Sequence, residues 1–335
     1  MPSLSGKTNG CQGGNMAFSN AISRAWNQFF FTGFSGESLG LLRMYIGCGL
    51  LFFHTYQFVT VLSLNPAGSM YYFIEPIWYF HLLGIQYHIP ALSFAVYFLL
   101  MGATVAMIMG KWTRTSIIVV ILCIFYLKGV RDSFSGDVHH RYIIPMQILM
   151  LFLLSKCGEV CSRDAQYKQP SPGIQEWEAS WPIKTMQLYV ALFYFWSVIA
   201  KVRVSGWVWF AGEGRIQEVL IKRSVRWGVT GEGELVKNSL SFELAQHPEL
   251  IQIFSHLVLA FELGFPLILF IKSVKLRALF LAGVITFHIS TFVLMDVNFL
   301  LIPFVYLIFF DLVPIHAWLK ARASQIFGPR PSIAS

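Results

Sequence analysis

Residues 89–109 read IPALSFAVYFLLMGATVAMIM and contain no charged side chain. A helix needs about 20 predominantly apolar residues to cross the hydrocarbon core of a bilayer, and this stretch has that length. It is followed by Lys111 and Arg114, basic residues of the kind that flank membrane spans. Residues 89–109 therefore predict a transmembrane helix.

Similar apolar stretches recur along the whole chain, and the fourth of them is short unless it starts within His139–Tyr142 or runs tilted. They predict an all-α fold, a polytopic integral membrane bundle of about eight transmembrane helices. The predicted spans are Leu41–Leu62, Ile89–Met109, Thr115–Gly129, Tyr142–Leu154, Ile183–Ala200, Leu250–Phe270, Leu276–Leu294 and Phe299–Leu319.

The composition agrees with a membrane protein and excludes a water-soluble domain. Hydrophobic residues make up 56% of the chain and charged residues 13%, whereas a soluble domain carries about a quarter charged residues. The formal net charge of +8 comes from basic residues in short runs between apolar segments. That pattern favours topology signals and anionic lipid headgroups over nucleic acid. The expected partner is the lipid bilayer.

The chain divides into three parts, and no apolar region of a cleavable signal peptide is visible at the amino terminus. The expected parts are a polar cytoplasmic segment over 1–38, a transmembrane domain over 39–320 with an outer loop at 201–249, and a short tail over 321–335. Most Lys and Arg residues fall on the side that holds both termini, so the positive-inside rule predicts that both termini are cytoplasmic.

Polar and titratable residues collect toward the opposite, outer ends of the predicted spans. Ionisable groups within a membrane are costly and mark functional sites by default. A lone His is nevertheless often a hydrogen-bonded packing residue, and Lys201 could be a cation at a helix end that extends toward the surface. The residues in question are His54, Asp137, His139, His140, Arg141, Lys201, His256, His288, Asp296 and Asn298.

Glu262 is the hardest residue to explain as packing, because it lies in the middle of the sixth span and must be paired or neutral there. Arg43, in the first span, is a candidate partner. His139 and His140 are adjacent, and adjacent side chains on a helix point to different faces, so shared metal binding is not expected. We predict no metal site.

Motifs of soluble enzymes are nearly absent, since the chain has no GxGxxG, no P-loop and no HExxH. Residues 36–40, GESLG, fit the GxSxG nucleophile elbow. That motif requires a preceding strand and an α/β sheet, which this chain does not offer, so Ser38 is better interpreted as the N-cap of the first span. Without such motifs, we expect any site in this chain to be reached from the membrane, which favours a lipid-soluble substrate.

Several short motifs, in order, resemble the membrane region of the vitamin K-dependent gamma-carboxylase and the horizontally transferred transmembrane (HTTM) superfamily. The resemblance runs from about residue 41 to 319. The motifs are Leu41-Leu42-Arg43, His139-His140-Arg141-Tyr142, QLYVALFYFWSVIAK at Gln187–Lys201, Gly206-Trp207-Val208-Trp209, Phe287-His288 and Phe309-Phe310-Asp311.

The resemblance implies a membrane enzyme in which Lys201 is the base that deprotonates a quinol, His140 assists it, and His288 belongs to the same site. It implies a reduced isoprenoid quinone and O2 as the reacting partners. An amine in an apolar site can act as a base near neutral pH. The family's large lumenal domain has no counterpart here, so carboxylation of a protein substrate is not expected.

The leading hypothesis is an enzyme that uses lysine and histidine acid–base chemistry on a prenylated lipid such as an isoprenoid quinol, by oxygenation, epoxidation or coupled carboxylation. One alternative is a terpene-type isoprenoid cyclase started by a protonated Asp137, Glu262 or His. Another is a non-enzymatic maturation, immunity or transport component. Supporting or alternative acid–base residues are His139, Asp137, His256, Glu262, Arg43 and Asp296.

Overall fold

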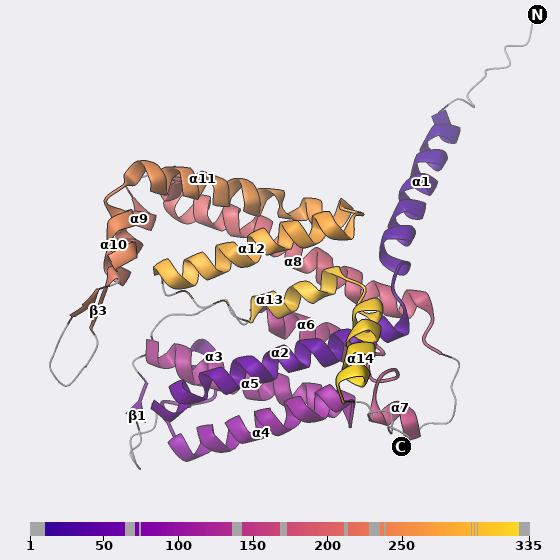
Figure 1. The fold of residues 1–335 in the computed structure, drawn as a ribbon, viewed down its shortest axis with the longest axis horizontal. Coiled ribbons are helices and arrows are strands. Elements are labelled where there is room, and N and C mark those ends of the chain that lie inside the picture. Colours follow the sequence, from indigo (N-terminus) through magenta and orange to yellow (C-terminus); the bar gives the residue numbers. More distant parts are fainter. Residues whose placement is uncertain are drawn as a thin grey trace, which may run out of the picture.

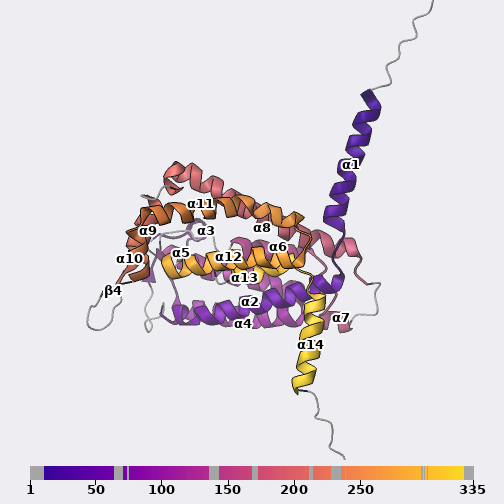
Figure 2. The ribbon, with the colours of Figure 1, turned by 45° about the horizontal axis from the view of Figure 1, so that its top comes forward.

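The computed structural model of the chain describes residues 11–63, 71–73, 75–135, 143–167, 173–210, 214–227, 235–237, 239–295, 297, 299 and 301–327. Most of its helices run back and forth along one long axis (Figure 1), and the view in Figure 2 shows the same arrangement. Both α1 (Cys11–Phe31) and α14 (Val313–Phe327) leave the bundle at the same end, where α2 (Gly36–Ser63) begins.

The bundle consists of α2 and seven further segments, two of them extended by 3-10 turns. These are α4 (Pro90–Met109), α5 (Thr113–Ser135), α6 (Ile143–Leu154), α8 (Glu176–Ser205), α11 (Pro248–Gly264) with η3 (Phe265–Phe270), α12 (Val274–Met295), and α13 (Ile302–Val305) with η4 (Tyr306–Phe309). The segment predicted over residues 89–109 corresponds to α4 within one residue. Pro90 at its first turn and the left-handed Gly110 after its last explain both ends.

Short elements connect the bundle helices at its two ends. The helical ones are α3 (Trp78–Leu82), α7 (Arg163–Tyr167), η2 (Gly206–Phe210), α9 (Arg215–Ser224) and α10 (Ser239–Ala245). Two small antiparallel sheets pair β1 (Tyr71–Tyr72) with β2 (Tyr87–His88) and β3 (Val225–Trp227) with β4 (Leu235–Lys237). The segment predicted as an outer loop from residue 201 is therefore folded in part, and α8 continues through Lys201 to Ser205.

Within the described ranges, five helical segments are long and apolar enough to cross a membrane. They are Gly36–Tyr56, Pro90–Met109, Glu176–Phe210, Pro248–Phe270 and Val274–Met295. A sixth is added if residues 302–309 and α14 count as one span, although the chain bends there by 112°. The helices α5 and α6, both predicted as spans, are not among the five, and α6 has only 12 residues.

The prediction of one continuous helix over Phe299–Leu319 is wrong. The helix stops at Phe309 and α14 starts at Val313 in a new direction. Asp311, between them, accepts a hydrogen bond from the backbone N–H of Val313 at 3.2 Å, which caps the start of α14. Pro314 fits the first turn of a helix but not its interior, so it favours this restart.

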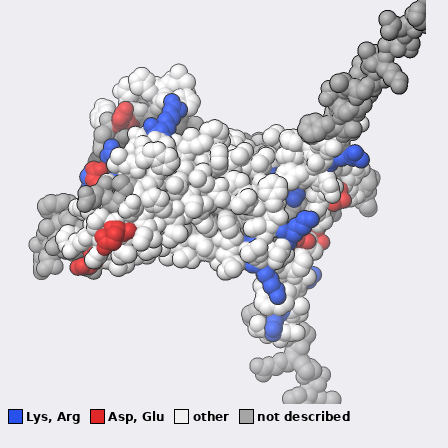
Figure 3. All heavy atoms as spheres, turned by 90° about the horizontal axis from the view of Figure 1, so that it is seen from above, with Lys and Arg blue, Asp and Glu red and all other residues white. Residues whose placement is uncertain are grey.

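The surface of the bundle is apolar between two charged ends. On the face seen in Figure 3, Lys, Arg, Asp and Glu side chains lie toward the ends, and a broad belt without them lies between. Large apolar side chains on the bundle helices are also exposed, such as Phe98 on α4 (62%) and Leu279 on α12 (71%), whereas the core holds fully buried residues such as Ile183 and Phe265. An exposed apolar belt of this kind is stable only in lipid. The chain is therefore a multi-pass, all-α membrane protein.

Candidate functional site

Lys201 and Glu262 form an ion pair inside the bundle. The Nζ atom of Lys201, on α8, lies 2.5 Å from Oε1 of Glu262, on α11, and also contacts Oε2. Ser197, one turn earlier on α8, donates a weak hydrogen bond to the same Oε1 at 3.4 Å. Residues four apart on a helix share one face, so α8 presents both side chains to Glu262.

The pair is largely removed from solvent, since the side chain of Lys201 is 19% exposed and that of Glu262 only 5%. Each charge alone would be strongly destabilised in such surroundings, and together they compensate one another. The ion pair places the Lys201 ammonium beside Glu262, and Lys201 lies in the last two turns of α8, which ends at Ser205. An ammonium and a carboxylate in contact can exchange a proton, so the pair can both accept and donate one.

His288 lies in a second buried cluster with two tyrosines. Its Nε2 atom lies 2.6 Å from the hydroxyl of Tyr194, on α8, and 2.8 Å from the hydroxyl of Tyr306, on η4. The two hydroxyls also bond to each other. The Nδ1 atom of His288 has no hydrogen-bond partner among the described residues. Three helical segments thus place three proton-exchanging groups within hydrogen-bond distance of one another.

Tyr194 connects the two clusters because it lies on α8 seven residues before Lys201, two turns along the same face. Its phenol is close enough to Glu262 for the carboxylate to act on it electrostatically. The ring of Tyr194 stacks on Phe265 at 4.2 Å between centroids, which fixes its position. Two polar clusters, the Lys201–Glu262 pair and the Tyr194–His288–Tyr306 cluster, therefore lie along α8 inside the bundle.

Other residues predicted for the site do not belong to either of these two clusters. His256 is exposed on α11, and its Nδ1 atom lies 2.7 Å from the backbone carbonyl of Gln252 one turn before. Within the described ranges, no group of three His, Cys, Asp or Glu residues is placed to hold a metal ion. Six further residues of the predicted set lie outside the described ranges, namely Asp137, His139, His140, Arg141, Asp296 and Asn298.

Arg43 is not the partner of Glu262, which corrects the sequence prediction. Its guanidinium is completely buried and donates to the backbone carbonyls of Met107, Ile108, Cys157 and Cys161. Met107 and Ile108 belong to the last turn of α4, where carbonyls have no helical partner and attract a cation. Arg43 therefore joins the end of α4 to the chain that follows α6, and its role is structural.

Ser38 is not part of a nucleophile elbow. It lies in the first turn of α2 with no strand before it, and its Oγ atom donates to Asp311 at 2.7 Å. The N-cap of α2 is Ser35, whose Oγ atom accepts a hydrogen bond from the backbone N–H of Ser38 at 3.2 Å. The prediction of a helix start was confirmed, but the capping residue is three positions earlier.

Sequence reasoning missed Tyr194 and Tyr306. Both lie in apolar helical stretches, where tyrosine is usually a packing residue or an anchor at the membrane surface. The spacing of Tyr194 from Lys201 on one helix face was the available signal. Nothing in the sequence could link Tyr306 to His288, because the two residues lie on separate helical segments, α12 and η4.

Comparison of the chain with protein-family models, with curated proteins and with solved structures finds no match.

Proposed function

We propose that this protein is a membrane enzyme that uses the Lys201–Glu262 pair for acid–base chemistry on a prenylated lipid, with an isoprenoid quinol as the favoured substrate. The single observation that supports it most is a buried ammonium–carboxylate pair beside the Tyr194–His288–Tyr306 cluster. Ionisable groups at membrane depth are costly to maintain, which favours a functional role over packing.

This proposal gives the two charged partners different roles from those that the motif resemblance implies. The carboxylate of Glu262 accepts the proton, and Lys201, which is in contact with it, is its cationic partner. Lys201 then stabilises the quinolate anion that forms. O2 is the oxidant that the resulting quinolate meets, and oxygenation or epoxidation, with or without a coupled carboxylation, is the proposed reaction. The Tyr194–His288–Tyr306 cluster carries the proton away from Glu262.

The proposed topology has eight passes with both termini on the cytoplasmic side. Support comes from the positions of α1 and α14, which leave the bundle at one end, as an even number of passes requires. The basic stretch Lys272–Arg277, which runs from the connection after η3 into the first turn of α12, is a further cytoplasmic feature of this topology.

Purified protein in detergent supplies the test. Reduced isoprenoid quinone is added under air and under strict anaerobiosis, and the quinone products are identified by mass spectrometry. We expect an oxygenated quinone only under air. Unchanged quinone in both cases would refute the proposal.

The same assay separates the alternative functions. A cyclase would convert a prenyl diphosphate or polyprene without O2, and a transport or maturation component would leave both kinds of substrate unchanged.

A further inference from the structure

The helix α14 turns out of the bundle and lies across its end. The chain bends by 112° between residues 302–309 and α14, and Figure 1 and Figure 2 both show α14 crossing the long axis of the bundle. The long apolar helices cross the bilayer along that axis, so a helix nearly perpendicular to it, at the bundle end, runs along the membrane surface. We propose that α14 is an interfacial helix that binds anionic phospholipids at this surface.

Contacts with α2 fix the direction of α14. Only three residues separate α14 from η4, and one of them, Asp311, accepts a hydrogen bond from the hydroxyl of Ser38 on α2 at 2.7 Å. In the first turn of α14, the Nδ1 atom of His316 lies 3.1 Å from the hydroxyl of Tyr45, also on α2. The protein itself therefore holds α14 across the bundle end, beside the membrane surface.

An uncovered apolar stripe runs along α14. Ile315, Trp318, Leu319 and Ile326 are spaced so that they share one face of the helix. They are between 42% and 70% exposed, so no described part of the protein covers them. An interfacial helix buries such a stripe about 5–10 Å into the boundary between headgroups and acyl chains. The bilayer beside α14 can cover this stripe without any partner protein.

The charge on α14 selects anionic lipid. The helix carries Lys320 and Arg322, both exposed, and no Asp or Glu. The guanidinium of Arg322 lies over the ring of Trp318, 5.7 Å from its centroid, so a cation lies next to the apolar stripe. Basic side chains next to a bilayer attract its anionic headgroups. A second copy of α14 would bring the same positive charge and would be repelled.

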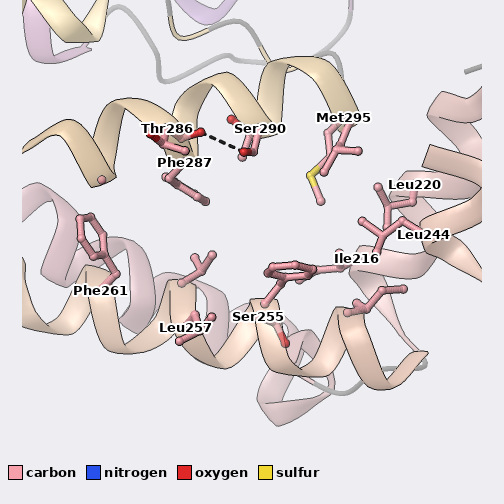
Figure 4. Close-up of a pocket in the computed structure, with 16 residues that line it drawn as sticks. Ile216, Leu220, Leu244, Ser255, Leu257, Phe261, Thr286, Phe287, Ser290 and Met295 are labelled. Atoms are coloured by element: carbon pink, nitrogen blue, oxygen red, sulfur yellow. Dashed lines mark hydrogen bonds between the residues drawn. The ribbon is translucent and has the colours of Figure 1, made fainter. Parts of the chain in front are cut away.

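The test uses photo-cross-linking of the full-length protein in vesicles of phosphatidylcholine and phosphatidylserine. The photoreactive residue benzoylphenylalanine replaces Trp318 on the apolar stripe or, as the matched control, Ser324 on the opposite face of α14. A third position, Leu257, reports lipid away from any cation. Leu257 is 60% exposed on α11 and lines a cavity of about 380 Å³ in whose described wall no residue is charged (Figure 4).

The first readout is the identity of the adducts, determined by mass spectrometry. We expect phospholipid adducts at position 318 and far fewer at position 324, because an interfacial helix turns one face to lipid and the other to water. Equal phospholipid labelling at both positions would overturn the proposal, since a helix surrounded by lipid would give that result. Adducts at position 318 that are mainly protein, or no adducts there, would overturn it as well.

The second readout is the ratio of phosphatidylserine to phosphatidylcholine adducts. At position 318 this ratio should exceed the ratio at position 257 by about fivefold, which corresponds to about 1 kcal/mol for one basic residue near the surface. Lys320→Gln combined with Arg322→Gln should remove the enrichment. Arg203→Gln combined with Lys222→Gln, which removes two exposed cations at the other end of the bundle, should keep it. Enrichment that survives the loss of Lys320 and Arg322, or no enrichment in the wild-type background, would overturn the assignment of anionic lipid.

Discussion

Removing one partner of the Lys201–Glu262 pair should destabilise the protein far more than removing both. In the single variant Lys201→Met, the Glu262 carboxylate keeps its place at 5% exposure but loses its cation. Loss of one partner of a buried pair costs about 3–5 kcal/mol, because the remaining charge is uncompensated. Replacement of both partners by apolar residues of similar volume is often neutral.

The magnitude can be read as a change in thermal stability. At roughly 2–4 °C per kcal/mol, a value typical of chains somewhat shorter than this one, the single variant should lose about 6–20 °C in Tm. Lys201→Met combined with Glu262→Leu should recover most of that loss. The double variant should therefore lose far less stability than the sum of the two single variants, which is the signature of strong coupling between the two positions.

The assay is thermal unfolding of detergent-purified protein, followed by loss of the monodisperse size-exclusion peak. Lys156→Met is the matched control, since Lys156 also pairs with a glutamate, Glu178, but its side chain is 44% exposed. We expect that control to change Tm by less than about 2 °C. Additive effects of the Lys201 and Glu262 substitutions would refute the reasoning, because they would mean that the two charges do not compensate one another in the folded protein.

Three further predictions concern the framework, each checked by Tm in the same detergent. Arg43→Lys should lose about 3–5 kcal/mol, since a single ammonium cannot reach the four carbonyls that the guanidinium bonds, and near-native stability would contradict the structural role. The Asp164 carboxylate accepts hydrogen bonds from the backbone N–H groups of Trp112 and Thr113 at 2.8 Å each and so caps α5. Asp164→Ala should therefore lose about 1–2 kcal/mol of stability, and Asp164→Asn should recover part of it. No recovery in Asp164→Asn would argue against a capping role. Burial lowers the pKa of His88 below its usual 6.5, so the neutral imidazole stabilises the fold above pH 6.5 and this stability is lost as the pH falls through the lowered pKa. Between pH 7 and 5, His88→Gln should therefore lose less Tm than the wild type. An identical loss of Tm in both would contradict the assignment.

The helical elements of this fold could largely be predicted from hydropathy, because a membrane span must satisfy its backbone internally and cover itself with apolar side chains. The segment Ile89–Met109 matches α4 almost residue for residue. The prediction failed over Phe299–Leu319, where hydropathy remains high across the bend. A capped turn at Asp311 interrupts the helix there without lowering the apolar content.

The candidate site was predicted residue by residue but not as an arrangement. Lys201, Glu262 and His288 all stood out because titratable groups are rare in apolar helices. The pairing of Lys201 with Glu262 joins positions 61 residues apart on different helices, and no local pattern encodes it. Arg43 was a candidate partner of Glu262 because it also lies in a predicted span, and the sequence could not show that backbone carbonyls surround Arg43.

The central claim, that the Lys201–Glu262 pair performs acid–base chemistry on a quinol, is tested most directly by the initial rate of O2 consumption with reduced isoprenoid quinone. The comparison is between the wild type, the stable double variant Lys201→Met with Glu262→Leu, and the control Lys156→Met. Our account predicts a fall of about 100-fold or more in the double variant, with Lys156→Met unchanged. A double variant that folds and consumes O2 at the wild-type rate would contradict it.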